Sequence, residues 1–494
     1  MELISKIKKD NIFLPFLFGL IGILAFEPFG LKFLLFLSYG YLFYKLTYQE
    51  KNISFKTKIS TLISWFIGHW LIGTSWIIVS IYYYGNTGLT VSIILFLLLC
   101  CACFAFYFSP FLLLKFYKKK YPFKALLLFI SVLTLIELGR NFFLGGFPWL
   151  RPGIIFNESI LSFLLPVIGT TGASFLFYFL CFIFIRYIKI NIYSLIVLIL
   201  FGTVFQNNYY TKIDNENLTK VNFSLVQPST DPFTKYDPKH LLSVEETLID
   251  LSKSVPSNSE FIVWPEAPLP YPNSDLRFLN IIKQLKKPLV TGTWTYSGDN
   301  LHNSILSTSD DNLYNKVKLV PFGEYIPFER ILRGLIDFFD LPMSQVRPGK
   351  NNITSLKVGD YIFSPFICFD ISFENLFRKN IDKSSLFVIN VSNDSWFGNS
   401  IGPYQHLEIL KTRANENKIF ILRATNDGIS AVISNKGTIV DKIEKGESTV
   451  LNSYAYTGTE RSFYNLFGYY IVFIVMFFCL IINFDTIKRI YESN

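Results

Sequence analysis

Charged side chains are scarce in this chain of 494 residues. Asp, Glu, Lys and Arg make up 17% of it, whereas hydrophobic residues make up 51%. This balance excludes an ordinary soluble enzyme and indicates a chain partly embedded in a bilayer. Histidine and cysteine are also rare, with four and six copies. No Cys/His metal-ligand spacing is present, and the cysteines other than Cys368 lie inside long apolar runs. We therefore expect no bound metal and no cofactor.

Long apolar runs fill the first two hundred residues and recur once near the C-terminus. Each approaches the length that a helix needs to cross a bilayer. We predict spans at residues 12–26, 31–46, 59–83, 89–114, 123–138, 160–185, 192–205 and 463–482. The first run is not a convincing cleaved signal peptide, because no small-x-small site follows it and another span comes directly after.

Lysine and arginine mark alternate loops of this predicted bundle. They are frequent in the N-terminal segment, around Lys56, around Lys119 and in the C-terminal tail, and almost absent around Pro28 and Asn86. Because positively charged loops stay in the cytoplasm, both termini are predicted to be cytoplasmic and residues 207–461 to lie outside. The net charge of +9 suits an anionic membrane surface better than nucleic acid.

The sequence texture changes at Lys220, where short apolar runs alternate with polar, helix-like segments. Strands are predicted at residues 221–227, 261–264, 288–294, 304–307, 361–367, 386–391, 419–424 and 430–434, and helices at 240–254, 274–285 and 404–416. This alternation indicates a layered α/β or α+β domain of about 240 residues, ample for its own core. We therefore predict a bundle at 1–206, a polar domain at 207–461 and a last span with its tail at 462–494.

Cys368 is the only cysteine of the polar domain and follows the apolar run 361–367. A cysteine at a strand-to-helix turn lies near backbone N–H groups, which can lower its pKa and stabilise an oxyanion. Glu266 and Lys316 also lie near the ends of short apolar runs, where sites assemble in layered folds. A carboxylate to accept the thiol proton, an ammonium group to stabilise the oxyanion and a thiolate to form a thioester together predict acyl transfer.

Each candidate also has a purely structural interpretation. These are a small buried hydrophobe for Cys368, a helix cap for Glu266, a solvated charge for Lys316, an ion pair with Arg330 for Glu324 and an ordinary turn for Asn393 and Asp394. A Cys–His pair stays open as a less favoured mechanism, since His302 or His406 could approach Cys368 in the fold.

The predicted bundle has two unusual polar features. Glu137 and Arg140 are three residues apart and can pair on one helix face, either at a functional site or as an anchoring ion pair. Residues 145–150 cannot continue a helix, and we predict a re-entrant or surface loop with Trp149 at the membrane interface.

These motifs resemble the apolipoprotein N-acyltransferase family, which is part of the nitrilase superfamily with its Glu-Lys-Cys triad. The resemblance covers nearly the whole chain. Its motifs are GFPWL at 146–150, VQP at 226–228, WPE at 264–266, YNKVKLVPFGEYIP at 314–327, IC at 367–368, NDSWFG at 393–398, IGPYQH at 401–406 and LRATNDGISA at 422–431. It implies about seven spans, an α-β-β-α nitrilase-like domain and one final span.

The resemblance also implies roles for single residues. Glu266 matches the catalytic base, Lys316 the triad lysine, Cys368 the nucleophile and Glu324 a second essential glutamate. The implied reaction moves a fatty acyl chain from a phospholipid such as phosphatidylethanolamine, through a thioester, to the α-amine of the diacylglyceryl-cysteine of a lipoprotein. The implied setting is the bacterial inner membrane, with a periplasmic catalytic domain on a monomer that does not bind nucleic acid.

Some positions depart from the family pattern. Tyr236 stands where Trp is expected, and Phe369 and Asp370 stand where Tyr-Glu is common. Supporting or substrate-binding roles are implied for these three residues and for Asn393 and Trp396. The departures bear on rate and lipid preference rather than reaction type. The segment 456–461 matches the family poorly, and we expect an apolar lid at 335–341.

Two other functions are weighed against this one. A membrane-tethered nitrilase-type amidase would use the same triad but would leave the seven spans and the GFPWL loop unexplained. A transporter or sensor would carry more polar or broken-helix signals in its spans, and alkylating Cys368 would not affect it.

Overall fold

The computed structural model describes residues 12–48, 54–84, 88–111, 122–187, 219–321, 323–325, 346–350 and 353–482. The chain divides into two compact units. The first contains Met1–Ile78, Gly88–Tyr210 and Phe467–Asn494, and the second contains Val79–Thr87 and Thr211–Leu466. The predicted span at 192–205 and the predicted lid at 335–341 lie outside the described residues.

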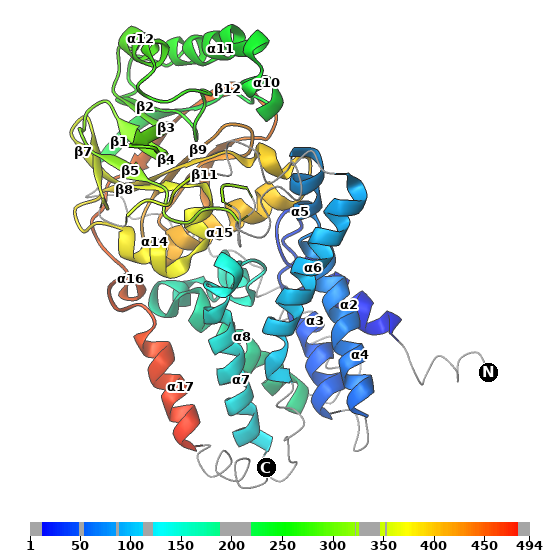
Figure 1. Cartoon of the computed structure of the whole chain (residues 1–494). Coiled ribbons are helices and arrows are strands. Elements are labelled where there is room, and N and C mark those ends of the chain that lie inside the picture. The colour runs from blue at the N-terminus through cyan, green and yellow to red at the C-terminus, as the bar shows by residue number, and fades with distance from the viewer. Residues whose placement is uncertain are drawn as a thin grey trace. The chain divides into compact units, whose positions relative to one another are not determined.

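The first unit consists of apolar helices (Figure 1). Its α-helices are α2 (Phe13–Ile23), α3 (Phe33–Phe43), α4 (Phe55–Phe66), α5 (Trp76–Val79, which ends in the second unit), α6 (Leu89–Tyr107), α7 (Pro122–Gly139), α8 (Leu165–Tyr187) and α17 (Tyr470–Ile482). Among the described residues, the helices Leu89–Tyr107 and Ser162–Phe184 are each long and apolar enough to cross a membrane. The bent pair Phe55–Leu71 and Trp76–Tyr82 adds a third if it forms one span.

Several helices are shorter than the spans predicted from sequence. Helix α2 has 11 residues, which is roughly 16 Å at a rise of about 1.5 Å per residue, against about 30 Å of hydrocarbon. The apolar run continues beyond it, but the chain turns through Pro28 and Gly30, whose φ is 65°. Hydrophobicity alone did not mark this end, because Leu24, Ala25 and Phe26 continue the apolar run past the last helical residue.

Glycine lets two helices of this unit approach closely. A Cβ atom at Gly19 of α2 would lie 2.3 Å from the carbonyl oxygen of Trp65, and one at Gly68 would lie 2.2 Å from that of Phe16. Small residues at such crossings bring helix backbones together and increase van der Waals packing.

The charged side chains of Glu137, Arg140 and Arg151 are buried together in this unit. Arg140 Nη1 lies 2.9 Å from Glu137 Oε2, which confirms the pair predicted from their spacing, and Arg151 Nε lies 3.4 Å from the same oxygen. Arg140 also donates to the carbonyl oxygen of Trp149, whose side chain is only 1% exposed and packs against Trp76. Trp149 is therefore buried within the helical unit, and its position at the membrane interface stays a prediction.

The second unit is built on two six-stranded sheets in the described part of the chain. The strands of the first, in spatial order, are β12 (Thr449–Tyr456), β1 (Lys220–Gln227), β2 (Phe261–Val263), β3 (Leu289–Ser297), β4 (Asn300–Ser307) and β5 (Leu313–Asn315). Those of the second are β11 (Ile439–Ile443), β10 (Ser430–Ile433), β9 (Ile421–Thr425), β8 (Phe387–Ser392), β7 (Tyr361–Ile367) and β6 (Leu356–Val358). Parallel pairing links β1, β2 and β3 in one sheet and β7, β8 and β9 in the other.

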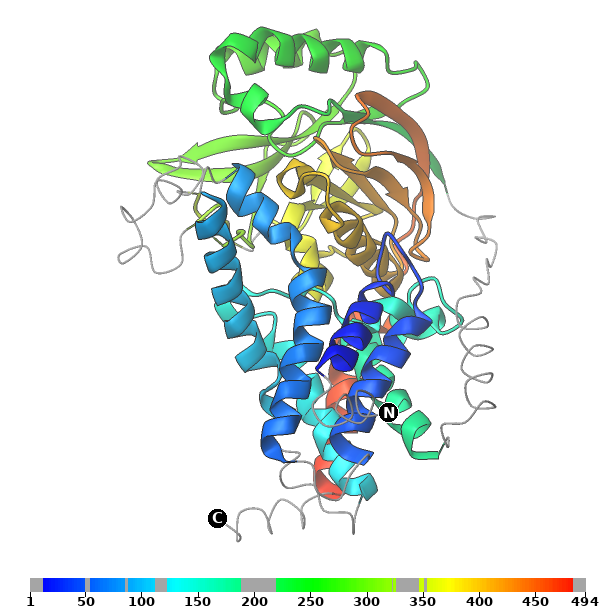
Figure 2. The same cartoon turned by 90° about the vertical axis from the view of Figure 1, so that its right-hand side faces the viewer.

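The two sheets pack face to face and helices cover their outer faces (Figures 1 and 2). Side chains of β1, β2, β7, β8 and β9 form the core between the sheets. Helices α11 (Leu241–Lys253) and α12 (Leu276–Gln284) pack on the first sheet, and α14 (Glu374–Asn380) and α15 (Gly402–Asn417) pack on the second. The short helices α10 (Pro232–Tyr236) and α16 (Phe463–Phe467) complete the set of described α-helices. The predicted α-β-β-α sandwich is therefore confirmed.

Burial on both faces explains the apolar strands at the centre of each sheet. The side chains of β2 and β8 are all buried, and a buried parallel strand reads as a continuous apolar run. The carboxyl ends of β2, β7 and β8 lead directly into the segments that carry Glu266, Cys368 and Asn393.

Candidate active site

Three chain segments bring Glu266, Lys316 and Cys368 to one end of the sandwich. Glu266 lies three residues beyond β2, Lys316 directly follows β5, and Cys368 begins the 3₁₀ turn η11 (Cys368–Ser372) directly after β7. All three side chains are buried, with exposed fractions of 7%, 2% and 9%. The alternative of a solvated charge at Lys316 is therefore wrong.

Lys316 lies between two carboxylates. Its Nζ is 3.2 Å from Glu266 Oε1 and 2.9 Å from Glu324 Oε1. Burial lowers the pKa of this ammonium group, but the charges of Glu266 and Glu324 outweigh burial and raise it well above its usual value. Lys316 is therefore a fixed cation, suited to stabilising a negative oxygen but unsuited to taking up a proton.

Asn303 of β4 connects the two glutamates. Its Nδ2 donates to Glu266 Oε1 at 2.6 Å and to Glu324 Oε1 at 3.2 Å, while the backbone N–H of Val320 donates to Glu324 Oε2 at 2.8 Å. These bonds orient both carboxylates toward Lys316. Glu324 is thus an ion-pair partner of Lys316, whereas Arg330 lies outside the described residues.

The turn that carries Glu266 is tightly held. Ala267 has a φ of 38°, a backbone conformation that L residues rarely adopt, and its carbonyl oxygen accepts a hydrogen bond from Lys235 Nζ at 3.0 Å. A Cβ atom at Gly292 of β3 would lie 2.6 Å from Glu266 Cα. Burial lowers the pKa of Lys235 to about 8, against the opposing effect of Glu266.

Cys368 also has a strained backbone, with a φ of 43°. Burial raises the pKa of its thiol, and the charges of Glu266 and Asp394 raise it further, whereas Lys316 lowers it. The resting side chain is therefore a neutral thiol at neutral pH. Its activation requires a base that removes the proton as the sulfur attacks.

Asp370 holds the turn that follows Cys368. Its Oδ2 accepts a hydrogen bond from the hydroxyl of Tyr314 at 2.9 Å, and its Oδ1 accepts one from the backbone N–H of Lys318 at 2.6 Å. The N–H of Ile367 also donates to Oδ2 at 3.3 Å. Asp370 thereby links the segments that carry Cys368 and Lys316.

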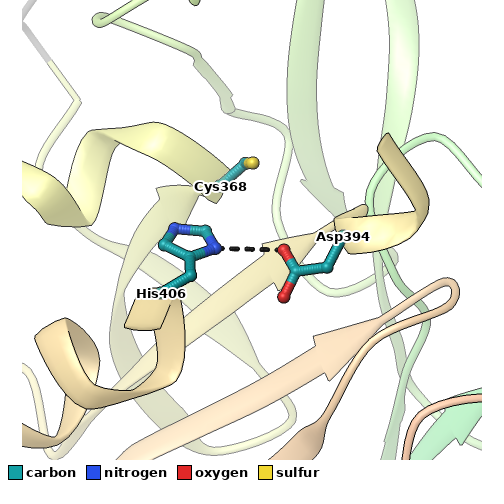
Figure 3. Close-up of side chains that lie close together, drawn as sticks. All are labelled: Cys368, Asp394 and His406. Carbon is teal, nitrogen blue, oxygen red and sulfur yellow. Dashed lines mark hydrogen bonds and ion pairs between the residues drawn. The ribbon is translucent and has the colours of Figure 1, made fainter. Parts of the chain in front are cut away.

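A second polar group lies beside the thiol (Figure 3). One ligand atom each of Cys368, Asp394 and His406 lie within 4.8 Å of one another. His406 Nδ1 is 3.0 Å from Asp394 Oδ1, and Arg423 Nη2 is 2.6 Å from Asp394 Oδ2. Three potential ligands could hold a metal ion, but the Arg423 guanidinium already supplies the cation that neutralises Asp394.

Comparison with known proteins shows which family has a similar sequence. The family model "Apolipoprotein N-acyltransferase N-terminal domain" matches residues 18–183, and "Carbon-nitrogen hydrolase" matches residues 223–453. The apolipoprotein N-acyltransferase of Haemophilus influenzae is 31% identical, over 91% of this chain and 90% of that protein. Those of Pasteurella multocida and Wigglesworthia glossinidia brevipalpis are each 30% identical, over 95% and 98% of this chain and 94% and 100% of theirs.

The chain belongs to the apolipoprotein N-acyltransferase family. It is an acyltransferase with a carbon-nitrogen hydrolase domain and a helical unit of the family's N-terminal type. The strand-end residues predicted from sequence are thus the buried centre of an apolipoprotein N-acyltransferase fold.

The remaining predicted residues lie around this centre. Phe369 is 9% exposed and packs edge-on against Phe373, with ring centroids 5.1 Å apart. Tyr236 is 37% exposed and its ring lies 4.7 Å from Lys235 Nζ. Asn393 accepts the backbone N–H of Ser395, and Trp396 lies half-buried in the 3₁₀ turn η12 (Asp394–Phe397).

The sequence motifs assign no role to Asn303 or Lys235, and they contain Asp394 and Arg423 without giving either a role in the chemistry. Asn303 carried no signal of its own, because its strand β4 also contains Asn300, His302 and Ser304. Of the two histidines left open, His406 lies beside Cys368, whereas His302 has its Nδ1 2.8 Å from the carbonyl oxygen of Arg347.

Proposed function

We propose that this protein transfers a fatty acyl chain from a phospholipid to the N-terminal diacylglyceryl-cysteine of a lipoprotein. The observation that carries the proposal is a fixed ammonium group, Lys316, held between Glu266 and Glu324 at the site of the only buried thiol in the described part of the sandwich. The relatives named as apolipoprotein N-acyltransferases supply the acceptor class.

In the first half-reaction, Glu266 takes the Sγ proton of Cys368 as the sulfur attacks the ester carbonyl of the donor lipid. The carbonyl oxygen becomes an oxyanion, which Lys316 stabilises. The C–O bond to the glycerol then breaks, and Glu266 returns its proton to the departing oxygen. The products are a lysophospholipid and a thioester on Cys368.

In the second half-reaction, the α-amine of the acceptor attacks the thioester carbonyl. Glu266 accepts a proton from the amine, and the C–S bond breaks as the amide forms. The proton returns to the sulfur and restores the thiol. Glu324 and Asn303 hold Lys316 and Glu266 in position during both steps. We assign no metal or cofactor to either step.

We favour Glu266 over His406 as the base. Nδ1 of His406 already faces both Asp394 and Arg423, whereas Glu266 is paired with the cation that stabilises the oxyanion. We place the protein in the bacterial inner membrane as a monomer, with the catalytic unit in the periplasm and a phosphatidylethanolamine-like donor. The distribution of lysine and arginine supports this orientation.

A mass measurement in two stages tests the proposal. Purified full-length protein incubated with defined phospholipid alone should gain one fatty-acyl mass on the Cys368 peptide. Adding a diacylglyceryl-cysteine peptide should remove the adduct and yield an N-acylated peptide. We expect no adduct in Cys368→Ala, and a loss on the order of a hundredfold or more in Glu266→Gln and Lys316→Ala.

An exposed carboxylate provides the matched control. Glu444→Gln should form the adduct at the wild-type rate, because the Glu444 side chain is 48% exposed and pairs only with Lys442 among described side chains. N-acylation that persists in Cys368→Ala would defeat the mechanism. Release of free fatty acid without any acylated peptide would instead indicate a hydrolase.

A further inference from the structure

Arg423, Asp394 and His406 form a buried polar group that the proposed mechanism does not use. Arg423 and Asp394 are fully buried and His406 is 1% exposed. They come from β9, from η12 and from the first turns of α15, and Figure 3 shows Asp394 and His406 converging on Cys368. We call these three residues the Arg423 group.

Each member of the Arg423 group is fixed in position. Arg423 Nη1 donates to Asn390 Oδ1 at 2.6 Å, and Nη2 donates to Asp394 Oδ2 at 2.6 Å. The other carboxylate oxygen of Asp394 accepts the hydroxyl of Ser392 at 2.9 Å and faces His406 Nδ1 at 3.0 Å. The Asp394 carboxylate therefore cannot turn away from the thiol without breaking several bonds.

The fixed position of the Asp394 carboxylate affects the thiol through the charges around Cys368. Glu266 and Asp394 are the anions that act on the thiol, and Lys316 is the cation that opposes them. Asp370 lies two residues away, with its carboxylate bonded to Tyr314 and to backbone N–H groups. Although burial favours the neutral acid, Arg423 and His406 hold the pKa of Asp394 below its usual range, so it stays ionised beside the sulfur.

An ionised Asp394 alone would oppose thiolate formation, since two negative charges close together in a buried site repel each other. Arg423 cancels that charge at a distance of 2.6 Å. Burial keeps His406 neutral by lowering its pKa, so the imidazole adds no charge and fills the space between Asp394 and the turn at Cys368.

We propose that Arg423 and Asp394 are positioning residues that set the ionisation of the nucleophile: Asp394 anchors His406 behind Cys368, and Arg423 neutralises Asp394 so that the thiol can lose its proton. The proposal rests on the assignment of Cys368 as the nucleophile. It predicts that losing the Asp394 charge and losing the Arg423 charge change the reactivity of Cys368 in opposite directions. If the pair were purely structural, both losses would change that reactivity in the same direction.

The test measures how fast iodoacetamide alkylates Cys368 at pH 8 in the full-length protein in detergent, without any lipid. Mass spectrometry of the Cys368 peptide separates this thiol from the five others. Because the thiolate is the reacting form, a shift of one unit in the thiol pKa changes the rate about tenfold. We expect Asp394→Asn to react about tenfold faster than wild type and Arg423→Gln about tenfold slower.

The double variant Asp394→Asn/Arg423→Gln closes the cycle. It has lost both charges, so its alkylation rate should return to within about threefold of wild type. It also avoids the unpaired buried charge that each single variant leaves. If Arg423→Gln does not fold, the alkylation rates of Asp394→Asn and of the double variant still test the proposal. A slower or unchanged rate in folded Asp394→Asn, or a double variant as slow as Arg423→Gln, would overturn the proposal.

Glu416→Gln is the matched control. Glu416 is a fully buried carboxylate on the same helix, α15, paired with Arg413 and ten residues beyond His406. It should lower thermal stability but leave the alkylation rate unchanged. Because no lipid is present, this test can fail while acyl transfer stands, and acyl transfer can fail while the opposite rate changes are still observed.

Discussion

At the scale of single residues, Asp370 offers a prediction in which the size of a stability change depends on pH. Burial raises the pKa of this carboxyl to about 6, against the lowering effects of Lys316 and its hydrogen bonds. The folded protein therefore holds the proton more tightly than the unfolded chain between about pH 4 and 6. The stability that this group contributes is full below pH 4 and is lost as the pH rises toward 6, by about 1.4 kcal/mol per unit.

Asp370→Asn removes that contribution. We expect the variant to have a lower Tm than wild type, because Asn has one side-chain oxygen where the carboxyl group of Asp370 has two to meet Tyr314, Lys318 and Ile367. The gap in Tm should be wider at pH 4.5 than at pH 7. Thermal unfolding in detergent at both values checks this, with the exposed Asp299→Asn as control. A gap that widens with pH would contradict the buried, proton-retaining carboxyl.

At the scale of elements, the approach of β3 to the Glu266 turn leaves room only for glycine. An added Cβ at Gly292 would lie 2.6 Å from Glu266 Cα and 2.7 Å from Ala267 N, both backbone atoms that cannot rotate away. Gly292→Ala should therefore displace Glu266 from Lys316. A displacement near 1 Å lowers the rate of acyl-enzyme formation by about a hundredfold.

Gly458→Ala serves as the control, because a Cβ there meets no atom within 4 Å. It should form the Cys368 adduct at the wild-type rate. Pre-steady-state adduct formation, followed by mass spectrometry alongside Tm, separates a displaced base from a misfolded domain. Wild-type kinetics in Gly292→Ala would show that the turn tolerates the shift and that the position of Glu266 is less critical than its contacts imply.

The strands at the centre of each sheet could be predicted from sequence, and those at the edges could not. The run Tyr361–Ile367 was predicted with the bounds that the structure has, because burial on both faces makes it apolar throughout. The edge strand Ile439–Ile443 was missed, since its middle residues are exposed and include Asp441 and Lys442. The edge strand Leu313–Asn315 has three residues of mixed polarity, too few for a period to appear.

The candidate site divides in the same way. Glu266 and Cys368 could be singled out because each follows an apolar run that marks a strand end, and Lys316 because it lies in the motif at residues 314–327 that resembles the family. Asn303 and Arg423 could not be singled out, since Asn303 meets Glu266 and Arg423 meets Asp394 only through sheet pairing and tertiary packing. The distance of His406 from Cys368 likewise depends on how α15 packs on the second sheet, which no local pattern encodes.

At the scale of the whole molecule, the proposed orientation places the catalytic unit outside the cytoplasmic membrane. Both proposed substrates are lipids anchored in that membrane, so a nucleophile on the outer side would meet them where exported lipoproteins reside. Two exposed positions report the two sides. Asp299 lies in the turn between β3 and β4 of the catalytic unit, and Lys56 lies in the first turn of α4, in a lysine-rich segment.

We expect Asp299→Cys to react with a membrane-impermeant maleimide in intact spheroplasts, and Lys56→Cys to react only after the membrane is permeabilised. Wild-type protein supplies the background from the six native cysteines, of which Cys368 is buried. If the maleimide instead labelled Lys56→Cys from outside and spared Asp299→Cys until permeabilisation, the catalytic unit would face the cytoplasm. Cys368 would then lie on the wrong side of the membrane for exported acceptors. The lysine-rich loops would also have failed to predict the topology.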